Sequence, residues 1–426
     1  MIYKQAVKYL DEGSGTLRNR IYSENKEQTA KQIYALVSQT LKYRAALSHV
    51  LKSSRIIEQE KKLSEKIAML MVHDLLFSKS KKIMCGNCPE KQAVLRHKTR
   101  LSGELVKYKV KNGPITEETN VTPVRWIRAN AEKCDAATVE EFLKSKNLVP
   151  FEKHTVDAKA YFVDPYVKGL FGIHPSFPII KSELYKNGSI IIQDRASCFP
   201  VAIMQPEPDK CYIDACSAPG NKTTLLAAQA KRVDAFERDK RRGQILKKMI
   251  SVAGLDKKVT IHIQDFTLAK PEEFETIEGL IVDPSCSGSG IFGRESLANQ
   301  SENNDCQVDE NLTERLAKLA EFQYIIMSHA LKFDARVVVY STCSIHSEEN
   351  ERVVKRLLEH PGIREKWQLR DRSNVLPGWP RRGLVEEFEG MENAKELAES
   401  CVRVAPQVDG GIGFFAACFE RKEPLS

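Results

Sequence analysis

The sequence has no long hydrophobic run: nowhere do the roughly 18 uncharged apolar residues that span a bilayer follow one another. It also lacks a signal-peptide pattern, because Lys4, Lys8, Asp11 and Glu12 interrupt the first apolar steps. We therefore expect an intracellular protein without membrane contact. With 426 residues, of which 42% are hydrophobic and 29% charged, the composition is that of a globular chain of roughly three domains.

Patterns for disulfide bonding and metal binding are also missing. The 11 cysteines are odd in number and have no framework spacing, which favours reduced thiols. The one Cys-x-x-Cys, Cys85-Gly-Asn-Cys88, has no second Cys or His pair at zinc-ligand spacing. We therefore expect no metal and interpret this pair as part of an exposed loop.

Negative charge is scarce in the first quarter of the chain. Up to Pro114 there are 23 Lys and Arg against 10 Asp and Glu, whereas the remainder has 42 against 47. A basic module on a mildly acidic body indicates a polyanionic partner, most simply nucleic acid; a solvated Lys-rich surface is the alternative. Proline is absent before Pro89 and apolar residues recur every three or four positions. Residues 1–112 are therefore predicted to be a helical, basic RNA- or partner-binding domain.

The pattern changes twice in the rest of the chain. Residues 113–200 mix short strands, one helix and proline-containing loops, which predicts a small α+β RNA-recognition segment. In residues 201–424, Val- and Ile-rich strands alternate with helices. This alternation is typical of a parallel, doubly wound α/β sheet covered on both faces. In such sheets, ligands bind beyond the carboxyl ends of the strands.

Residues suited to a nucleoside-containing cofactor follow the first three predicted strands of this sheet. The first strand ends in Asp214-Ala-Cys-Ser-Ala-Pro-Gly-Asn-Lys222, which is neither G-x-G-x-x-G nor a P-loop. Its small residues let backbone N–H groups approach a polar ligand, and Lys222 suits a carboxylate. Glu237, after the second strand, suits a ribose diol, and Asp265 and Phe266, after the third, suit an adenine.

The fourth and fifth strands each end in a cysteine, within Asp283-Pro-Ser-Cys286-Ser-Gly and Ser341-Thr-Cys343-Ser344. Two cysteines at strand ends, beside Asp283 and near a cofactor, indicate thiolate chemistry. A redox disulfide is the less favoured alternative, because it usually uses Cys-x-x-Cys. The residues alone do not distinguish whether Cys286 or Cys343 is the nucleophile.

Together these motifs resemble the Nop/Sun family of RNA cytosine-C5 methyltransferases. Gln193-Asp-Arg-Ala-Ser197 is similar to the family's entry motif, residues 125–130 to its upstream basic strand, and residues 409–415 to its closing strands. The resemblance covers about residues 121–420. Asn221 replaces a family glycine, a variant most similar to family member five, which modifies large-subunit ribosomal RNA.

The resemblance implies a Rossmann-like class I domain that uses S-adenosylmethionine to methylate C5 of cytosine in ribosomal RNA. It further implies a nuclear or nucleolar location, with ribosomal RNA, free or in pre-ribosomal particles, as the partner. Cys343 would attack C6 of the cytosine, Cys286 would assist release, and Asp283 would bond the cytosine N3/N4 edge. The implied cofactor-binding residues are Cys216, Ser217, Ala218, Pro219, Gly220, Asn221, Lys222, Glu237, Arg242, Asp265 and Asp283.

A target cytosine must be unstacked to reach a thiolate between strand ends, so single-stranded or flipped RNA is expected. Arg125, Arg128 and Arg195 are the candidate contacts to its backbone, with surface salt bridges as the alternative for each. Other functions also fit parts of the pattern: a non-catalytic ribosome-assembly factor, an amino-methyltransferase, or methylation of another RNA such as tRNA. The intact cysteines argue against the first, and the Asp283-Pro-Ser-Cys286 sequence departs from the Asp/Asn-Pro-Pro-aromatic motif of the second.

Overall fold

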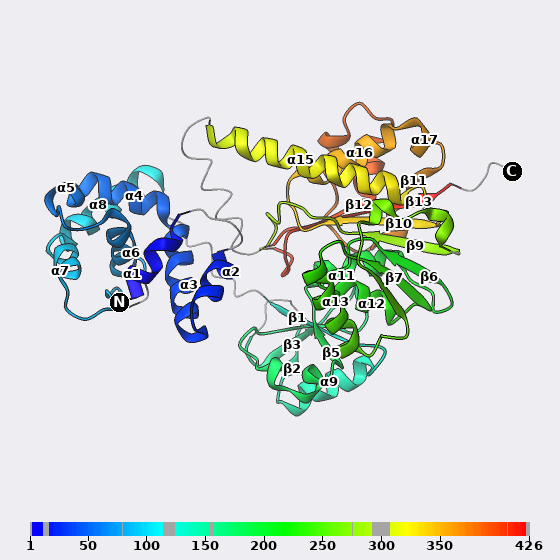
Figure 1. The fold of residues 1–426 in the computed structure, drawn as a ribbon, viewed down its shortest axis with the longest axis horizontal. Helices are drawn as coiled ribbons and strands as arrows, with labels where there is room; N and C mark the ends of the chain where they lie inside the picture. Colours follow the sequence, from blue (N-terminus) through cyan, green and yellow to red (C-terminus); the bar gives the residue numbers. More distant parts are fainter. Residues whose placement is uncertain are drawn as a thin grey trace. The chain divides into compact units, whose positions relative to one another are not determined.

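The computed structural model describes residues 2–11, 17–78, 80–113, 124–152, 157–274, 276–291, 307–406 and 408–422. The chain forms two compact units, one made of Met1–Asn120 and the other of Val121–Arg294 with Cys306–Ser426 (Figure 1). Within the described ranges, no helix combines the length and apolar character that a membrane crossing requires.

The first unit is helical, as the three-to-four-residue spacing predicts. Buried residues of the central helices, among them Ile33, Val37, Leu70 and Met71, form its core. Its helices are α1 (Ile2–Ala6), α2 (Leu17–Glu24), α3 (Glu27–Lys42), α4 (Arg44–Ser54), α5 (Ile56–Gln59), α6 (Glu65–Leu76), α7 (Pro89–Arg96) and α8 (Lys98–Asn112). The predicted first domain boundary, after residue 112, lies at the end of α8.

The second unit begins with a small α+β segment, which confirms that part of the predicted fold class. Its five strands pair in the order β2-β3-β4-β1-β5. Ile127 and Phe171 of the sheet pack against Val139 and Leu143 of helix α9 (Ala136–Ser145). The strands are β1 (Arg125–Ala129), β2 (Val149–Pro150), β3 (Ala160–Val163), β4 (Leu170–Ile173) and β5 (Ile190–Ile192), and a short helix, α10 (Glu183–Lys186), precedes β5.

The larger sheet is the doubly wound sheet that the strand–helix alternation predicts. Its strands follow the order β11-β13-β10-β9-β6-β7-β8, and β12 pairs with β13. Strands β6 to β10 run parallel, whereas β13 is antiparallel to β10. The strands are β6 (Cys211–Asp214), β7 (Arg232–Phe236), β8 (Val259–His262), β9 (Ile277–Val282), β10 (Val337–Thr342), β11 (Trp367–Leu369), β12 (Cys401–Val404) and β13 (Phe414–Arg421).

Helices cover both faces of this sheet (Figure 1). Val201 of α11 (Arg195–Met204) and Leu246 of α13 (Lys240–Ala253) belong to the core on one face, together with α12 (Asn221–Ala227). Met327 of α15 (Gln307–Ala330) and Val353 of α16 (Glu351–Glu359) belong to the core on the other. Two shorter helices, α17 (Pro361–Arg364) and α18 (Ala394–Glu399), follow.

The sheet order determines where a ligand can bind. Strand β6 lies between β7 and β9, so the chain returns from the edge strand β8 to the middle of the sheet. The crevice at the carboxyl ends of β6 and β9 is thus the topological switch point, the usual ligand site of such sheets. Helix α11 packs over this region and spans residue 200, so the predicted domain boundary at 200/201 falls inside a helix.

Candidate active site

A cavity of about 470 Å³ opens at the carboxyl ends of β6, β7, β9 and β10. The residues predicted from separate strand ends meet there. Of those residues, the following line the cavity: Cys216, Ala218, Glu237, Arg242, Asp265, Asp283, Cys286 and Cys343. The fold thus gathers carboxylates, three thiols and a guanidinium around one space.

The two predicted catalytic cysteines are in direct contact. Their Sγ atoms lie 3.1 Å apart, although 57 residues separate them in the chain. The loops that carry them are joined by the amide of Gly290, which donates to the Cys343 carbonyl at 3.0 Å. The contact with Cys343, burial, and the carboxylates of Glu349 and Asp283 raise the pKa of the Cys286 thiol. Cys286 therefore sits in a setting that favours its protonated form.

A partly buried ion pair lies beside the thiols. Lys222 Nζ donates to Asp283 Oδ2 at 2.7 Å and to Ser197 Oγ at 3.2 Å, and Ser341 Oγ donates to Asp283 Oδ1 at 2.7 Å. Burial would lower the pKa of Lys222, but Asp283 and Cys343 outweigh it and raise the pKa. An ammonium close to Cys343 favours the thiolate of Cys343. In this structure Lys222 pairs with Asp283, and its contact with a ligand carboxylate stays a prediction.

The turn between β6 and α12 is held by hydrogen bonds to β7 and α13. The Ser217 amide donates to the Phe236 carbonyl at 2.9 Å, and Arg242 Nη2 donates to the Ala218 carbonyl at 2.6 Å. Gly220 has φ +112°, and a Cβ there would come within 3.1 Å of Leu246 Cδ1. Five predicted cofactor residues belong to this turn or begin α12 and do not line the cavity: Ser217, Pro219, Gly220, Asn221 and Lys222. Cys216 and Ala218 are the parts of the turn that face it.

The far end of the cavity suits a nucleoside. Glu237 is 5% exposed; its Oε1 accepts from the Asp239 amide at 2.8 Å, and its Oε2 lies 3.4 Å from Arg242 Nη1. Asp265 Oδ1 accepts from the amide and hydroxyl of Thr267 at 2.9 and 2.7 Å. Burial would raise the pKa of Asp265, but the bonds from Thr267 and the charge of Arg238 lower it. The carboxyl groups of Glu237 and Asp265, beside the aromatic ring of Phe266, fit a ribose, an adenine and a cationic sulfonium.

The structure contradicts two of the three predicted RNA contacts. Arg128 is 1% exposed and donates to Gln193 Oε1 at 2.6 Å and Thr224 Oγ1 at 2.8 Å. Arg195 is 4% exposed and pairs with Asp164 at 2.5 Å. Both guanidiniums lie in the interior of the second unit and bond residues of other segments there. Neither can therefore reach an RNA phosphate. Arg125 is half-buried and donates to the Phe177 carbonyl at 3.1 Å; its RNA contact stays a prediction.

Sequence reasoning missed several residues of the site. Ser341 bonds Asp283, and Phe322 and Ile326 of α15 line the cavity. Phe322 and Ile326 lie on the apolar stripe of a predicted helix, where a residue facing a cavity cannot be told from one in the core. Ser341 precedes the Thr-Cys pair by one residue, and that proximity is the signal that could have identified it.

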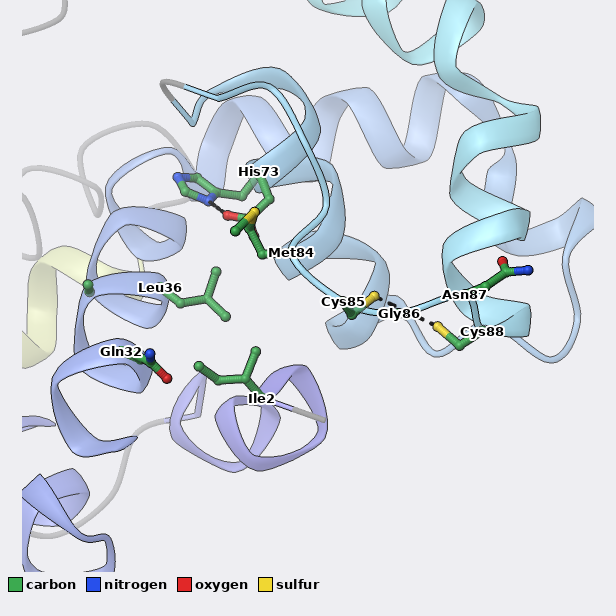
Figure 2. Close-up of a pocket in the computed structure, with 11 residues that line it drawn as sticks. Ile2, Gln32, Leu36, His73, Met84, Cys85, Gly86, Asn87 and Cys88 are labelled. Atoms are coloured by element: carbon green, nitrogen blue, oxygen red, sulfur yellow. Dashed lines mark hydrogen bonds and ion pairs between the residues drawn. The ribbon is translucent and has the colours of Figure 1, made fainter. Parts of the chain in front are cut away.

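A second cavity, of about 730 Å³, lies in the helical unit (Figure 2). Cys85 and Cys88 line it with their Sγ atoms 3.9 Å apart, and Figure 2 shows Ile2 and Leu36 pointing toward one another across it. Within the described ranges, no three His, Cys, Asp or Glu side chains are grouped so as to hold a metal ion. None of the predicted catalytic or cofactor residues lies in this cavity.

Known proteins resemble both parts of the chain. Residues 201–420 match the family model described as 16S rRNA methyltransferase RsmB/F, and residues 31–121 match that of the NOL1/NOP2/Sun domain family member 5 N-terminal domain. The chain is 40% identical to the 25S rRNA (cytosine-C(5))-methyltransferase rcm1 of Schizosaccharomyces pombe, covering 96% of this chain and 88% of the relative. It is 32% identical to a 28S rRNA (cytosine-C(5))-methyltransferase of Mus musculus, with the same coverage.

The fold also matches a solved structure. A methyltransferase homolog protein from Pyrococcus horikoshii superposes with a TM-score of 0.55, covering 87% of this chain and 98% of that chain at 19% identity. At this identity the match concerns the fold alone, and it agrees with the doubly wound sheet described above.

Proposed function

Because this chain belongs to the RsmB/F family of rRNA methyltransferases, we propose that it methylates C5 of a cytosine in large-subunit ribosomal RNA. The observation that carries the proposal is the pair of thiols 3.1 Å apart in the cavity, beside the Lys222–Asp283 ion pair. A non-catalytic assembly factor would have no need for this arrangement.

Covalent catalysis explains the need for a thiolate. C5 of cytosine is a poor nucleophile, and addition of the Cys343 thiolate to C6 moves electron density to C5. Glu237, Asp265, Cys216 and Ala218 would hold S-adenosylmethionine, which would supply the methyl group to C5. A base then takes the C5 proton, the electron pair of the C5–H bond forms the C5–C6 double bond, and the Cys343 thiolate leaves with the electron pair of the Cys343–C6 bond.

The remaining groups support these steps. Lys222 stabilises the Cys343 thiolate, because its ammonium acts on that thiol. Asp283, oriented by Lys222 and Ser341, bonds the N3/N4 edge of the cytosine. Cys286, whose raised pKa keeps it protonated, lies in contact with Cys343 and assists its release.

The remaining functions are assigned to three parts of the chain. Residues 1–112 are the basic module that docks RNA, residues 113–200 position it, and residues 201–424 carry the cofactor and the thiols. The target is a single-stranded or flipped cytosine, because a stacked base cannot reach a thiolate between strand ends. The place of action is the nucleolus, and the substrate is ribosomal RNA either free or in pre-ribosomal particles.

Methyl transfer to ribosomal RNA tests the proposal. The protein and its Cys343→Ala variant are incubated with unmodified large-subunit RNA and S-adenosylmethionine, and the product is mapped by bisulfite sequencing. We expect a protected cytosine with the wild-type protein and none with the variant. Transfer to an exocyclic amine would support the amino-methyltransferase, and no transfer despite cofactor binding would support the assembly factor.

A further inference from the structure

Two adjacent buried residues lie directly behind the thiol loops. Glu349 and Asn350 precede α16, and both are 0% exposed. Neither lines the cavity, so neither is placed to touch the cofactor or the RNA base. Their side chains nevertheless bond the two segments that carry the cysteines.

Glu349 holds the segment around Cys286. Its Oε1 accepts from the Ser287 amide at 2.8 Å and from Gln323 Nε2 at 3.0 Å. The same Gln323 nitrogen donates to the Ser285 carbonyl at 3.1 Å. The residues immediately before and after Cys286 are thus both fixed, one through Gln323 and one by the carboxylate itself.

The carboxylate of Glu349 is costly to bury. Its Oε2 is buried and has no hydrogen-bond partner among the described residues. A buried side-chain oxygen without a hydrogen-bond partner destabilises the fold. Its presence is therefore better explained by what it does for the Cys286 loop than by stability.

Asn350 holds the segment around Cys343 in a matching way. Its Oδ1 accepts from Thr342 Oγ1 at 2.5 Å, and its Nδ2 donates to the Ser344 carbonyl at 3.0 Å. Thr342 and Ser344 are the two neighbours of Cys343 in the chain. One side chain therefore fixes both sides of the second thiol.

We propose that Glu349 and Asn350 are the positioning residues of the two thiols, Glu349 for Cys286 and Asn350 for Cys343. Glu349 and Asn350 are consecutive in the chain, so a single peptide unit separates the two residues. Their side chains therefore hold the Cys286 loop and the Cys343 loop close to each other. Misplacing a reacting group by about 1 Å costs roughly a hundredfold in rate, so such anchors matter to the reaction. The inference rests on the proposed function, which supplies the separate roles of the two thiols.

Variants of the two residues should fail at opposite steps. Each protein is incubated with ribosomal RNA and S-adenosylmethionine, and denaturing gels then report the covalent adduct and the methyl product. Glu349→Ala should accumulate adduct, as expected of Cys286→Ala, with turnover lowered roughly a hundredfold. Asn350→Ala should lose both adduct and product, as expected of Cys343→Ala. Glu348→Ala, which removes a neighbouring carboxylate that pairs with Arg352 at 3.5 Å, is the control and should match the wild type.

Conservative variants separate positioning from folding. Glu349→Gln keeps an oxygen that can accept from the Ser287 amide and should restore turnover. A purely destabilising effect would not make the Glu349 and Asn350 variants fail at different steps of the reaction. If Glu349→Ala does not fold, Gln323→Leu removes the hold on Ser285 and should also accumulate adduct. Identical phenotypes for the Glu349 and Asn350 variants, or no rescue by Glu349→Gln, would overturn the inference. Absence of adduct from Cys286→Ala would instead contradict the proposed mechanism.

Discussion

Lys222 lies beside the cavity and Glu237 lines it, and the two residues have different partners. Lys222 donates a hydrogen bond to Asp283 and interacts electrostatically with Cys343. Glu237 has one carboxyl oxygen near Arg242, at the end of the cavity that suits a nucleoside. We therefore expect the first residue to act in the chemistry of the cytosine and the second in cofactor binding. The two contributions can be measured separately.

Cofactor affinity should respond to one of these residues only. Glu237→Ala removes a charge-assisted hydrogen bond, which is worth about 1.5–3 kcal/mol, so affinity for S-adenosylmethionine should fall roughly 10- to 100-fold. Lys222→Met should leave it close to the wild-type value, since Lys222 does not line the cavity. Titration calorimetry measures both. An equal loss in the two variants would place the ammonium on the cofactor, as the sequence first suggests.

Arg195 should behave as a residue of the core. Its guanidinium pairs with Asp164 and lies over the rings of Trp126 and Trp379, at 5.1 and 4.9 Å from their centroids. Arg195→Ala leaves the Asp164 carboxylate buried and unpaired, which should lower the free energy of unfolding by about 3–5 kcal/mol. Arg125→Ala, which removes one bond to a carbonyl, should cost about 1 kcal/mol. Urea unfolding distinguishes them; unchanged stability in Arg195→Ala, with weaker RNA binding, would reinstate it as an RNA contact.

The arginines also show that the exposure of a single residue could not be predicted from the sequence. Residue type and position after a strand were enough to select Asp283, Cys286 and Cys343, because strand ends of a parallel sheet meet in space. The same reasoning could not tell a surface arginine from Arg128 or Arg195, since burial depends on partners up to 284 residues away, as for Trp126 and Gly410. Sequence motifs indicate which residues are catalytic, but the exposure of a side chain depends on how the whole chain folds.

At the scale of elements, regular strands were predicted more accurately than short or irregular pieces. Short apolar runs predict strands at 211–214, 232–236 and 259–263, and β6, β7 and β8 begin and end within a residue of these limits. Helix α11 was missed, since Pro200 lies inside it and its surroundings read as loop. β11 and β12 have three and four residues, too few for a periodic pattern.

The β6–α12 turn makes the stability of the protein depend on pH. Burial raises the pKa of Asp214 to about 6, and the hydrogen bond from Thr223 Oγ1 offsets this only in part. Between pH 4 and 6 the folded protein therefore binds more protons than the unfolded chain, so stability falls as pH rises through this range. The fall attributable to this carboxyl is on the order of 3 kcal/mol.

Asp214→Asn should remove this dependence, because an amide does not titrate. Relative to the wild type, the variant should gain about 3 kcal/mol of stability between pH 4 and pH 7. Urea unfolding at the two pH values, without cofactor, gives the comparison. Parallel pH profiles for the two proteins would show that Asp214 is ionised equally in the folded and unfolded states.

At the scale of the whole molecule, the dominant feature is the division of charge between a basic helical unit and a mildly acidic catalytic one. Helix α8 carries exposed Lys98, Lys109 and Lys111, which suits contact with phosphates. A protein that neutralises phosphates releases counterions, so its affinity for RNA falls as salt rises. The basic unit should therefore govern how salt affects RNA binding, without touching the cofactor.

Substituting these three lysines tests that division. The Lys98→Gln, Lys109→Gln, Lys111→Gln variant should flatten the slope of log affinity against log salt by about 2 for single-stranded RNA. Cofactor affinity should not change. Lys332→Gln, Lys366→Gln and Lys395→Gln, which alter exposed lysines of the other unit, are the matched control. An unchanged slope in the α8 variant would favour a protein partner for these helices.

The central claim, that Cys343 attacks the base and Cys286 assists its release, is tested most directly by the covalent adduct itself. Cys286→Ala, Cys343→Ala and the double variant are incubated with labelled ribosomal RNA and S-adenosylmethionine, then separated on a denaturing gel. Cys286→Ala should retain an RNA-linked band with slow turnover, because methyl transfer proceeds while elimination stalls. Cys343→Ala and the double variant should show neither band nor product. An adduct in Cys343→Ala but not in Cys286→Ala would exchange the two roles, and full activity in both single variants would contradict thiolate catalysis altogether.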